Sequence, residues 1–205
     1  MKLRTYQVEA VNNIIRDFSN HDSLLLVMAT GTGKTVVLSY LVSKARAGRV
    51  LVLAHREELI TQLADTLGSY GLDVGIEMAD RKAGGWGWRQ PQVVVATVQT
   101  LVANQGSRLE RLVPDPSRWS LTVIDEAHHA PADSYRRILE HMNQNEKHRV
   151  LGVTATPDRA DRLAMGSVFD HVSFEYNLFD AVRDGFLCPI RQRAVFVESL
   201  DFSKC

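Results

Sequence analysis

The chain carries Met28-Ala29-Thr30-Gly31-Thr32-Gly33-Lys34-Thr35 near its amino end. The apolar residues 24–27 come before this run, and the mostly apolar, helix-compatible residues 36–42 follow it. A strand, a glycine loop and a helix in this order form the setting that a phosphate-binding loop requires. The glycines let the backbone approach a ligand closely, and the unpaired amides of the first helical turn point at one place. The run therefore predicts a site for phosphate groups.

Two side chains at the end of the run suit a nucleotide with its metal ion. Lys34 can reach the outer phosphates as a point charge, and the hydroxyl of Thr35 can bind Mg²⁺. The general pattern has glycine where this chain has Met28. The residues predicted to bind the phosphates are Thr30, Gly31, Thr32, Gly33, Lys34 and Thr35.

The composition is that of an ordinary globular domain. Hydrophobic residues make up 45% and charged residues 23%, and 24 basic residues balance 24 acidic ones. Zero net charge gives no bulk argument for nucleic acid, so such a site has to be a local patch. Two cysteines without a CxxC spacing argue against a disulfide framework or a zinc site and favour a reducing cytoplasm. No apolar run approaches the roughly 20 residues of a membrane span, so we expect no membrane partner.

Short apolar strands alternate with helical patterns along the chain. This alternation is typical of an α/β domain with a mostly parallel central sheet and helices on both faces. We expect the domain to span residues 1–185, and residues 186–205 to begin a linker. Strands are predicted at 23–28, 50–54, 93–96, 121–124 and 149–153, with weaker signals at 72–78 and 172–175. Helices are predicted at about 4–19, from the glycine loop to about 47, and at about 57–70, 134–143 and 178–184.

Polar groups follow directly after five of the predicted strands. In a parallel sheet a ligand binds at the carboxyl ends of the strands, which share one edge. We therefore expect these groups to converge on a single site. They are residues 30–35, 55–56, 97–99, 125–128 and 154–156.

An acidic pair, Asp125 and Glu126, follows the apolar residues 121–124. A carboxylate at a strand end can hold Mg²⁺, and the metal would bridge phosphate oxygens. A second carboxylate one residue on can orient or deprotonate an attacking water. Such a pair is also common in solvated turns, but the phosphate loop favours the metal site. We expect the amides around Lys34 and the two acids to hold opposite sides of one metal-bound triphosphate.

These motifs and others resemble, in order, the motifs of superfamily 2 helicases and translocases. Residues 30–35 resemble motif I, in which Met28 occupies a position where the family usually has alanine. Asp125-Glu126-Ala127-His128 resembles the DEAH box, and Thr154-Ala155-Thr156 resembles motif III. Three further matches are Arg4-Thr5-Tyr6-Gln7 with the adenine-reading element, 53–59 with motif Ia, and 96–101 with the next strand-end motif. The pair His128-His129 and residues 154–159 are similar to the branch that contains restriction-enzyme-type helicase subunits.

The resemblance implies the first RecA-like P-loop domain of an ATP-dependent DNA helicase or translocase. It implies that Gln7 contacts the adenine base and that Lys34, Asp125 and Glu126 are catalytic, with Thr35 and Asp125 holding Mg²⁺. It also implies a second RecA-like domain with an arginine finger. Nothing in the chain matches that domain, so we expect the fragment alone to hydrolyse ATP very slowly. Nucleic-acid contact or coupling is implied for Arg56, Thr97, Gln99, His128, Thr154 and Thr156.

Several alternatives stay open from sequence alone. Arg56 could pair with Glu57 or Glu58, and Thr97 and Gln99 could cap a helix instead of contacting nucleic acid. His129 lacks metal-ligand spacing and is interpreted as structural or surface. The rival functions are an RNA helicase, a nucleotide-gated nucleic-acid-binding module that does not unwind, and a degenerate domain kept for protein contacts. DNA and RNA are not distinguished, because contacts to the 2′-hydroxyl do not show in a sequence.

Overall fold

The computed structural model describes residues 3–45, 48–84, 90–155, 157–189 and 191. Within these residues seven strands form one sheet in the order β3-β4-β2-β5-β6-β1-β7, and every paired strand runs parallel to its neighbour. This confirms the α/β class and the parallel sheet predicted from the apolar strands. The strands are β1 Ser23–Met28, β2 Arg49–Ala54, β3 Val74–Glu77, β4 Val93–Thr97, β5 Trp119–Asp125, β6 Arg149–Thr154 and β7 His171–Tyr176.

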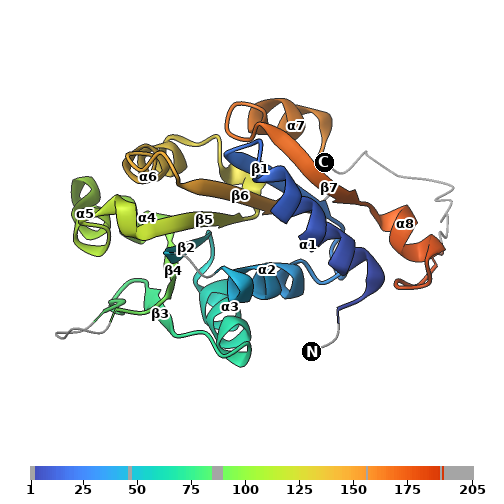
Figure 1. Cartoon of the computed structure of the whole chain (residues 1–205), viewed down its shortest axis with the longest axis horizontal. Coiled ribbons are helices and arrows are strands. Elements are labelled where there is room, and N and C mark those ends of the chain that lie inside the picture. The colour runs from blue at the N-terminus through green and yellow to red at the C-terminus, as the bar shows by residue number, and fades with distance from the viewer. Residues whose placement is uncertain (1–2, 46–47, 85–89, 156, 190, 192–205) are drawn as a thin grey trace, which may run out of the picture.

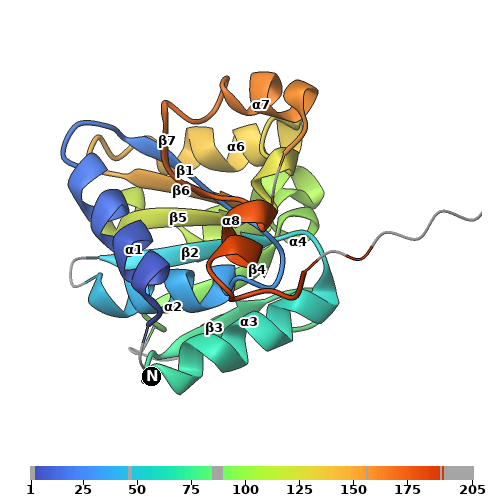
Figure 2. The ribbon, with the colours of Figure 1, turned by 90° about the vertical axis from the view of Figure 1, so that its right-hand side faces the viewer.

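Helices cover both faces of the sheet (Figures 1 and 2). Helices α1, α2 and α3 pack on one face, and α4, α5, α6 and α7 pack on the other. Successive strand residues serve the two faces in turn, so Leu24 and Leu26 contact the first layer while Leu25 and Val27 contact the second. The helices are α1 Thr5–Asp17, α2 Lys34–Lys44, α3 Glu57–Ser69, α4 Val98–Val102, α5 Ser107–Leu112, α6 Asp133–Met142, α7 Arg159–Met165 and α8 Leu178–Arg183.

The strand order brings distant parts of the chain to one edge of the sheet. β6 lies between β1 and β5, so one strand separates the glycine loop from the acidic pair. On the other side of β5 lie β2 and then β4, which end just before His55 and Val98. All five carboxyl ends meet at the same edge because the strands are parallel. The predicted convergence of the five polar groups is therefore confirmed for the residues that the structure describes.

Gly152 in the middle of β6 allows the acidic strand end to pack closely. A Cβ atom at this position would lie 2.4 Å from Phe169 and 2.9 Å from the Cβ of Ala127. Ala127 follows Glu126 directly, so the missing side chain leaves room for the turn that carries the acids to rest against the sheet.

A few elements differ from the sequence prediction. The helix expected to reach about residue 47 ends at Lys44, because Ala45 adopts an extended conformation. Helices α5 and α7 were not predicted, since six or seven residues are too short for a clear apolar periodicity. The linker predicted at 186–205 is described only at residues 186–189 and 191, and the boundary at 185 stays a prediction.

No helix in the described part of the chain is both long enough and apolar enough to cross a membrane.

Candidate nucleotide and nucleic-acid site

The glycine loop adopts the backbone conformation that its glycines allow. Gly31 and Gly33 have φ values of 84° and 86°, in the left-handed region. A Cβ atom on Gly33 would lie 2.6 Å from the Nε2 atom of Gln7, so the loop also needs glycine to pack against α1. The hydroxyl of Tyr6 and the amide of Gln7 both donate to the carbonyl of Thr32, at 2.7 and 3.0 Å. These two hydrogen bonds fix the glycine loop to α1.

Gln7 is almost fully buried, with 4% of its surface exposed. Its Nε2 atom donates to Thr32, and its Oε1 atom accepts a hydrogen bond of 3.0 Å from the backbone amide of Arg4. Both polar ends of the side chain are therefore engaged within the protein. The role of Gln7 as the adenine contact stays a prediction.

Lys34 and Thr35 begin α2 at the point where the loop ends. Both residues are partly exposed, and the Lys34 ammonium donates to the carbonyl of Met28 at 3.3 Å. The lysine side chain therefore folds back toward the start of its own loop. This is the arrangement in which a lysine can meet a phosphate as a point charge.

Asp125 lies at the end of β5 and has too few partners for its negative charge. Burial raises the pKa of its carboxyl above the ordinary value, and the adjacent charge of Glu126 raises it further. The backbone amide of Glu126 and the ammonium of Lys34 act in the opposite direction. The strand that carries Asp125 and the strand that leads into the Lys34 loop are separated by β6 alone. A bound cation stabilises the charged form of such a carboxylate.

Glu126 has an unusual backbone conformation, with φ 53° and ψ 58°. A residue other than glycine in this left-handed region costs about 1–2 kcal/mol. The turn Ala127–His129 follows it directly, and the amide of His129 donates to the Glu126 carbonyl at 3.0 Å. Such strain persists where the surrounding structure imposes it, and it turns the chain sharply at the strand end.

His128 joins the acidic pair to the end of β6. Its Nδ1 atom lies 3.3 Å from the hydroxyl of Thr154 and 3.5 Å from a carboxylate oxygen of Glu126. The structure thus brings together two residues for which the resemblance implies a coupling role. Thr156, the third residue of that group, lies outside the described residues.

The residues predicted to contact nucleic acid differ in how accessible they are. Arg56 is exposed ahead of α3, and no ion pair to it occurs within the described part of the chain. Gln99 is exposed and donates to Nδ1 of His55 at 3.1 Å. Thr97 is only 3% exposed, and its hydroxyl donates to Thr100 at 2.7 Å without capping α4. The Thr97 side chain therefore does not cap α4, and its contact with nucleic acid stays a prediction.

Two histidines that the sequence did not mark as functional lie in this region. The ring of His129 is 4.8 Å from the ring of His55 and 4.1 Å from the ring of His128, between centroids. The interpretation of His129 as an isolated structural or surface residue missed these contacts. The doubled histidine after the acids was the available signal, but its partner His55 is remote in sequence.

The residues at this edge fit a metal-bound nucleotide. In the described ranges no group of three or more His, Cys, Asp or Glu could hold a metal ion unaided. One carboxylate and one hydroxyl, completed by phosphate oxygens and water, form the kind of site that Mg²⁺ takes with nucleotides. Asp125 and Thr35 are the predicted donor pair, and the loop between β1 and α2 has left-handed φ values at Gly31 and Gly33.

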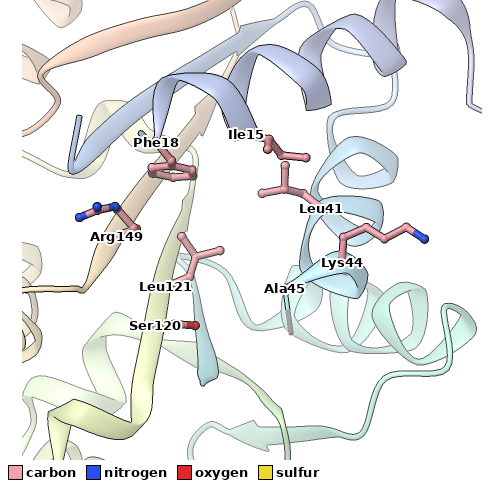
Figure 3. Close-up of a pocket in the computed structure, with 8 residues that line it drawn as sticks. All are labelled: Ile15, Phe18, Leu41, Lys44, Ala45, Ser120, Leu121 and Arg149. Atoms are coloured by element: carbon pink, nitrogen blue, oxygen red, sulfur yellow. The ribbon is translucent and has the colours of Figure 1, made fainter. Parts of the chain in front are cut away.

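A separate apolar cavity of about 330 Å³ contains none of the predicted site residues (Figure 3). It lies at the opposite edge of the sheet, next to the amino ends of β5 and β6 at Leu121 and Arg149. The ends of α1 and α2 close it with Phe18 and Leu41. Its distance from the acids and the glycine loop separates it from the nucleotide site.

Named proteins with similar sequences include helicases and restriction enzymes. The chain is 33% identical, over 96% of its length, to IRC3 of Saccharomyces cerevisiae, which is named as an ATP-dependent helicase. It is 29% identical, over 92% of its length, to the type I restriction enzyme EcoAI endonuclease subunit of Escherichia coli. The chain spans only 30% of the first of these relatives and 23% of the second.

A solved structure has the same fold. The type ISP restriction-modification enzyme LlaGI, a nuclease-deletion mutant in complex with a DNA substrate mimic, superposes with a TM-score of 0.68. It shares 22% sequence identity, and the match covers 91% of this chain and 21% of that enzyme. Residues 1–159 match the family described as "Type III restriction enzyme, res subunit". This range contains all the motifs from the adenine-reading element to motif III. Because this match spans most of its length, the chain belongs to the family of the res subunit of type III restriction enzymes.

Proposed function

We propose that this chain is the ATP-binding motor domain of a DNA helicase or translocase. The observation that carries the proposal is the order of the strands: the end of β5, with Asp125, and the glycine loop after β1 lie at the same edge of the parallel sheet, with only β6 between them. The family membership and the helicase names of the relatives support the same function. A nucleotide-gated module that does not unwind would use the same site, so the choice between them depends on what the nucleotide does.

Each residue of the site has a role in this proposal. The loop amides around Gly31 and Gly33 bind the phosphates, and Lys34 binds the outermost of them. Thr35 and Asp125 hold Mg²⁺, which neutralises charge on the phosphates when it is bound. Glu126 orients and deprotonates the attacking water. His128 and Thr154 link this carboxylate to β6.

DNA is the proposed second ligand. Arg56 and Gln99 are exposed beside the nucleotide site, at the ends of β2 and β4, where they can contact a phosphate backbone. The solved structure with a DNA substrate mimic favours DNA over RNA for this chain. A second RecA-like domain would complete the ATP site, in line with the much greater length of the relatives. The cytoplasmic location is a further proposal, which rests on the sparse cysteines alone.

The test is nucleotide binding by the 205-residue chain. We expect Mg-ATP to bind, and Lys34→Ala to weaken binding about 10- to 100-fold, as the loss of a hydrogen bond to a charged group does. Isothermal titration calorimetry measures both affinities. Lys44→Ala is the matched control, because Lys44 ends the same helix and its ammonium lies over the Tyr40 ring, away from the loop. Equal affinities of wild type and Lys34→Ala would contradict the proposal.

The same preparation tests the missing second domain. Without an arginine finger, steady-state ATP turnover should stay below about 1 s⁻¹, because that group is worth about 10³–10⁵ in rate. Faster turnover that Glu126→Gln abolishes would place the complete chemistry in this domain. Stimulation by single-stranded DNA but not by RNA of the same sequence would support the assignment of DNA, and the reverse would favour the RNA helicase.

A further inference from the structure

A row of side chains crosses the carboxyl edge of the sheet beside the nucleotide site. The neighbouring strands β4, β2, β5 and β6 each lead into one part of the row. Gln99 contacts His55, the His55 ring contacts His129, and the His129 ring contacts His128. His128 in turn lies next to Glu126 and Thr154. The row therefore connects the proposed catalytic acid to the strand ends proposed to contact nucleic acid.

His129 occupies the middle of this row. Its ring centroid is 4.8 Å from that of His55, with 30° between the ring planes, and 4.1 Å from that of His128, with 46°. Distances of this size are typical of packed aromatic rings. The ring of His129 thus connects His55, the residue after β2, to the turn that follows the acids.

The backbone ties His129 to Glu126. The His129 amide donates to the Glu126 carbonyl at 3.0 Å, and the Ala130 amide donates to Ala127 at 2.9 Å, so the turn is closed at both steps. Glu126 enters the turn in the left-handed conformation, which only the surrounding structure holds in place. A change in the orientation of Glu126 is therefore passed directly to His129.

The surroundings of His129 favour its neutral form. The Gln99 amide nitrogen can only donate, so Nδ1 of His55 accepts and the His55 proton lies on Nε2. Burial lowers the pKa of His129, and the nearby His128 and His55 lower it further. Glu126 and Asp161 act in the opposite direction with a smaller effect. A neutral His129 ring brings no charge of its own between the rings of His55 and His128.

We propose that His129 is a positioning residue that couples the conformation of Glu126 to His55 and Gln99. The proposal rests on the proposed function, since it assigns His129 the task of passing the nucleotide state to the nucleic-acid side. In it, nucleotide binding moves Glu126 and the turn Ala127–His129, and the His129 ring moves the His55 ring with it. His129 contacts neither ligand itself.

The experiment follows the His55 ring by NMR in the 205-residue chain. Histidine ring signals and glycine amide signals are recorded while Mg²⁺ and the non-hydrolysable analogue AMP-PNP are added. The amide signals of Gly31 and Gly33 report nucleotide binding. The ring signals of His55 report whether nucleotide binding also changes the surroundings of His55. In the wild type we expect the His55 ring to shift in step with the two glycine amides.

The variants separate coupling from structure. In His129→Ala we expect the glycine amides to respond as before and the His55 shift to be lost. His129→Asn also lacks the ring and replaces that variant if alanine prevents folding. His129→Phe keeps an aromatic ring and should retain the His55 shift. His21→Ala is the matched control, because His21 stacks on His171 at 4.7 Å on the far side of the sheet, outside the row.

The outcomes are distinct. A His55 shift that survives His129→Ala or His129→Asn would overturn the inference while leaving the proposed function intact. The same holds if the wild-type glycine amides respond and the His55 ring does not. If the wild-type glycine amides do not respond at all, the proposed function fails and the inference fails with it.

Discussion

Two carboxylates at strand ends of the same sheet have opposite surroundings. Glu77 ends β3 near one margin of the sheet, is 0% exposed, and is fully paired. It accepts hydrogen bonds from Arg108 Nε at 2.7 Å, from an Arg111 nitrogen at 2.7 and 2.8 Å, and from the Ala83 amide at 2.8 Å. Asp125 ends β5 near the middle, and its neighbours raise its pKa by burial and like charge.

Glu77 therefore stabilises the fold, whereas Asp125 is available to bind a ligand. The Glu77 pairs bind the segment after β3 to α5, and Arg108 adds a hydrogen bond to the carbonyl of Arg81 at 2.9 Å. A buried acid with every oxygen satisfied has nothing to offer a metal ion. Among the described residues no arginine or lysine forms an ion pair with Asp125, and a less stable arrangement of this kind is common at binding sites.

The largest effect is expected from breaking the paired acid. Glu77→Gln leaves two arginine side chains facing a neutral group, and loss of one partner of a buried ion pair costs about 3–5 kcal/mol of unfolding free energy. Urea denaturation measures the change. Glu110→Gln, an exposed residue on α5, is the control and should change stability by less than about 0.5 kcal/mol. A loss for Glu77→Gln no larger than for this control would remove the distinction between the two acids.

A smaller effect of opposite sign is expected at the unpaired acid. Without nucleotide, Asp125→Asn should leave the unfolding free energy unchanged or raise it by up to about 2 kcal/mol, because it removes a poorly solvated charge. Saturating Mg-ATP should add about 2.7 kcal/mol to the wild type at 100 times its Kd, and much less to the variant. Urea denaturation with and without Mg-ATP checks both values. Asp133→Asn, exposed at the start of α6, is the control, and destabilisation of Asp125→Asn as large as that of Glu77→Gln would contradict the comparison.

The smallest effect is a dependence on pH. The pKa of Asp125 is raised in the folded chain, so folding favours its protonated form. Its contribution to stability is therefore fully present below the ordinary value of about 3.8 and is lost as the pH rises through the raised pKa. In metal-free buffer, the advantage of Asp125→Asn over the wild type should be larger at about pH 7 than at about pH 4.5. Urea denaturation at the two pH values measures it, and an advantage that does not change with pH would show that Asp125 ionises normally.

Much of the fold could be predicted from the sequence because its signals are local. The strand predicted at 23–28 is β1 Ser23–Met28, since six buried residues lie between a polar break and the glycine loop. The glycine loop and the acids at the end of β5 were recognised for the same reason. The helix predicted at about 178–184 is α8 Leu178–Arg183, and Gly185 follows it with φ 76°. Short runs without periodicity, such as α7, gave no such signal.

Contacts between remote residues were not predictable. Thr97 was a plausible nucleic-acid contact by position, yet the packing of β4 buries it against Thr100. The Glu77 pairs join residues about thirty positions apart. Trp86 and Trp88, in the glycine-rich segment before β4, lie outside the described residues.

The amino-acid sequence by itself determined the order of strands and helices, the phosphate loop and the acidic pair, since each depends on neighbours within a few residues. Only the tertiary structure decided which strands lie side by side and hence that His55, His129 and Gln99 meet. The physical reason is that an apolar strand specifies which of its faces are buried but not which strand it pairs with. That choice depends on packing of the whole sheet between its two helical layers.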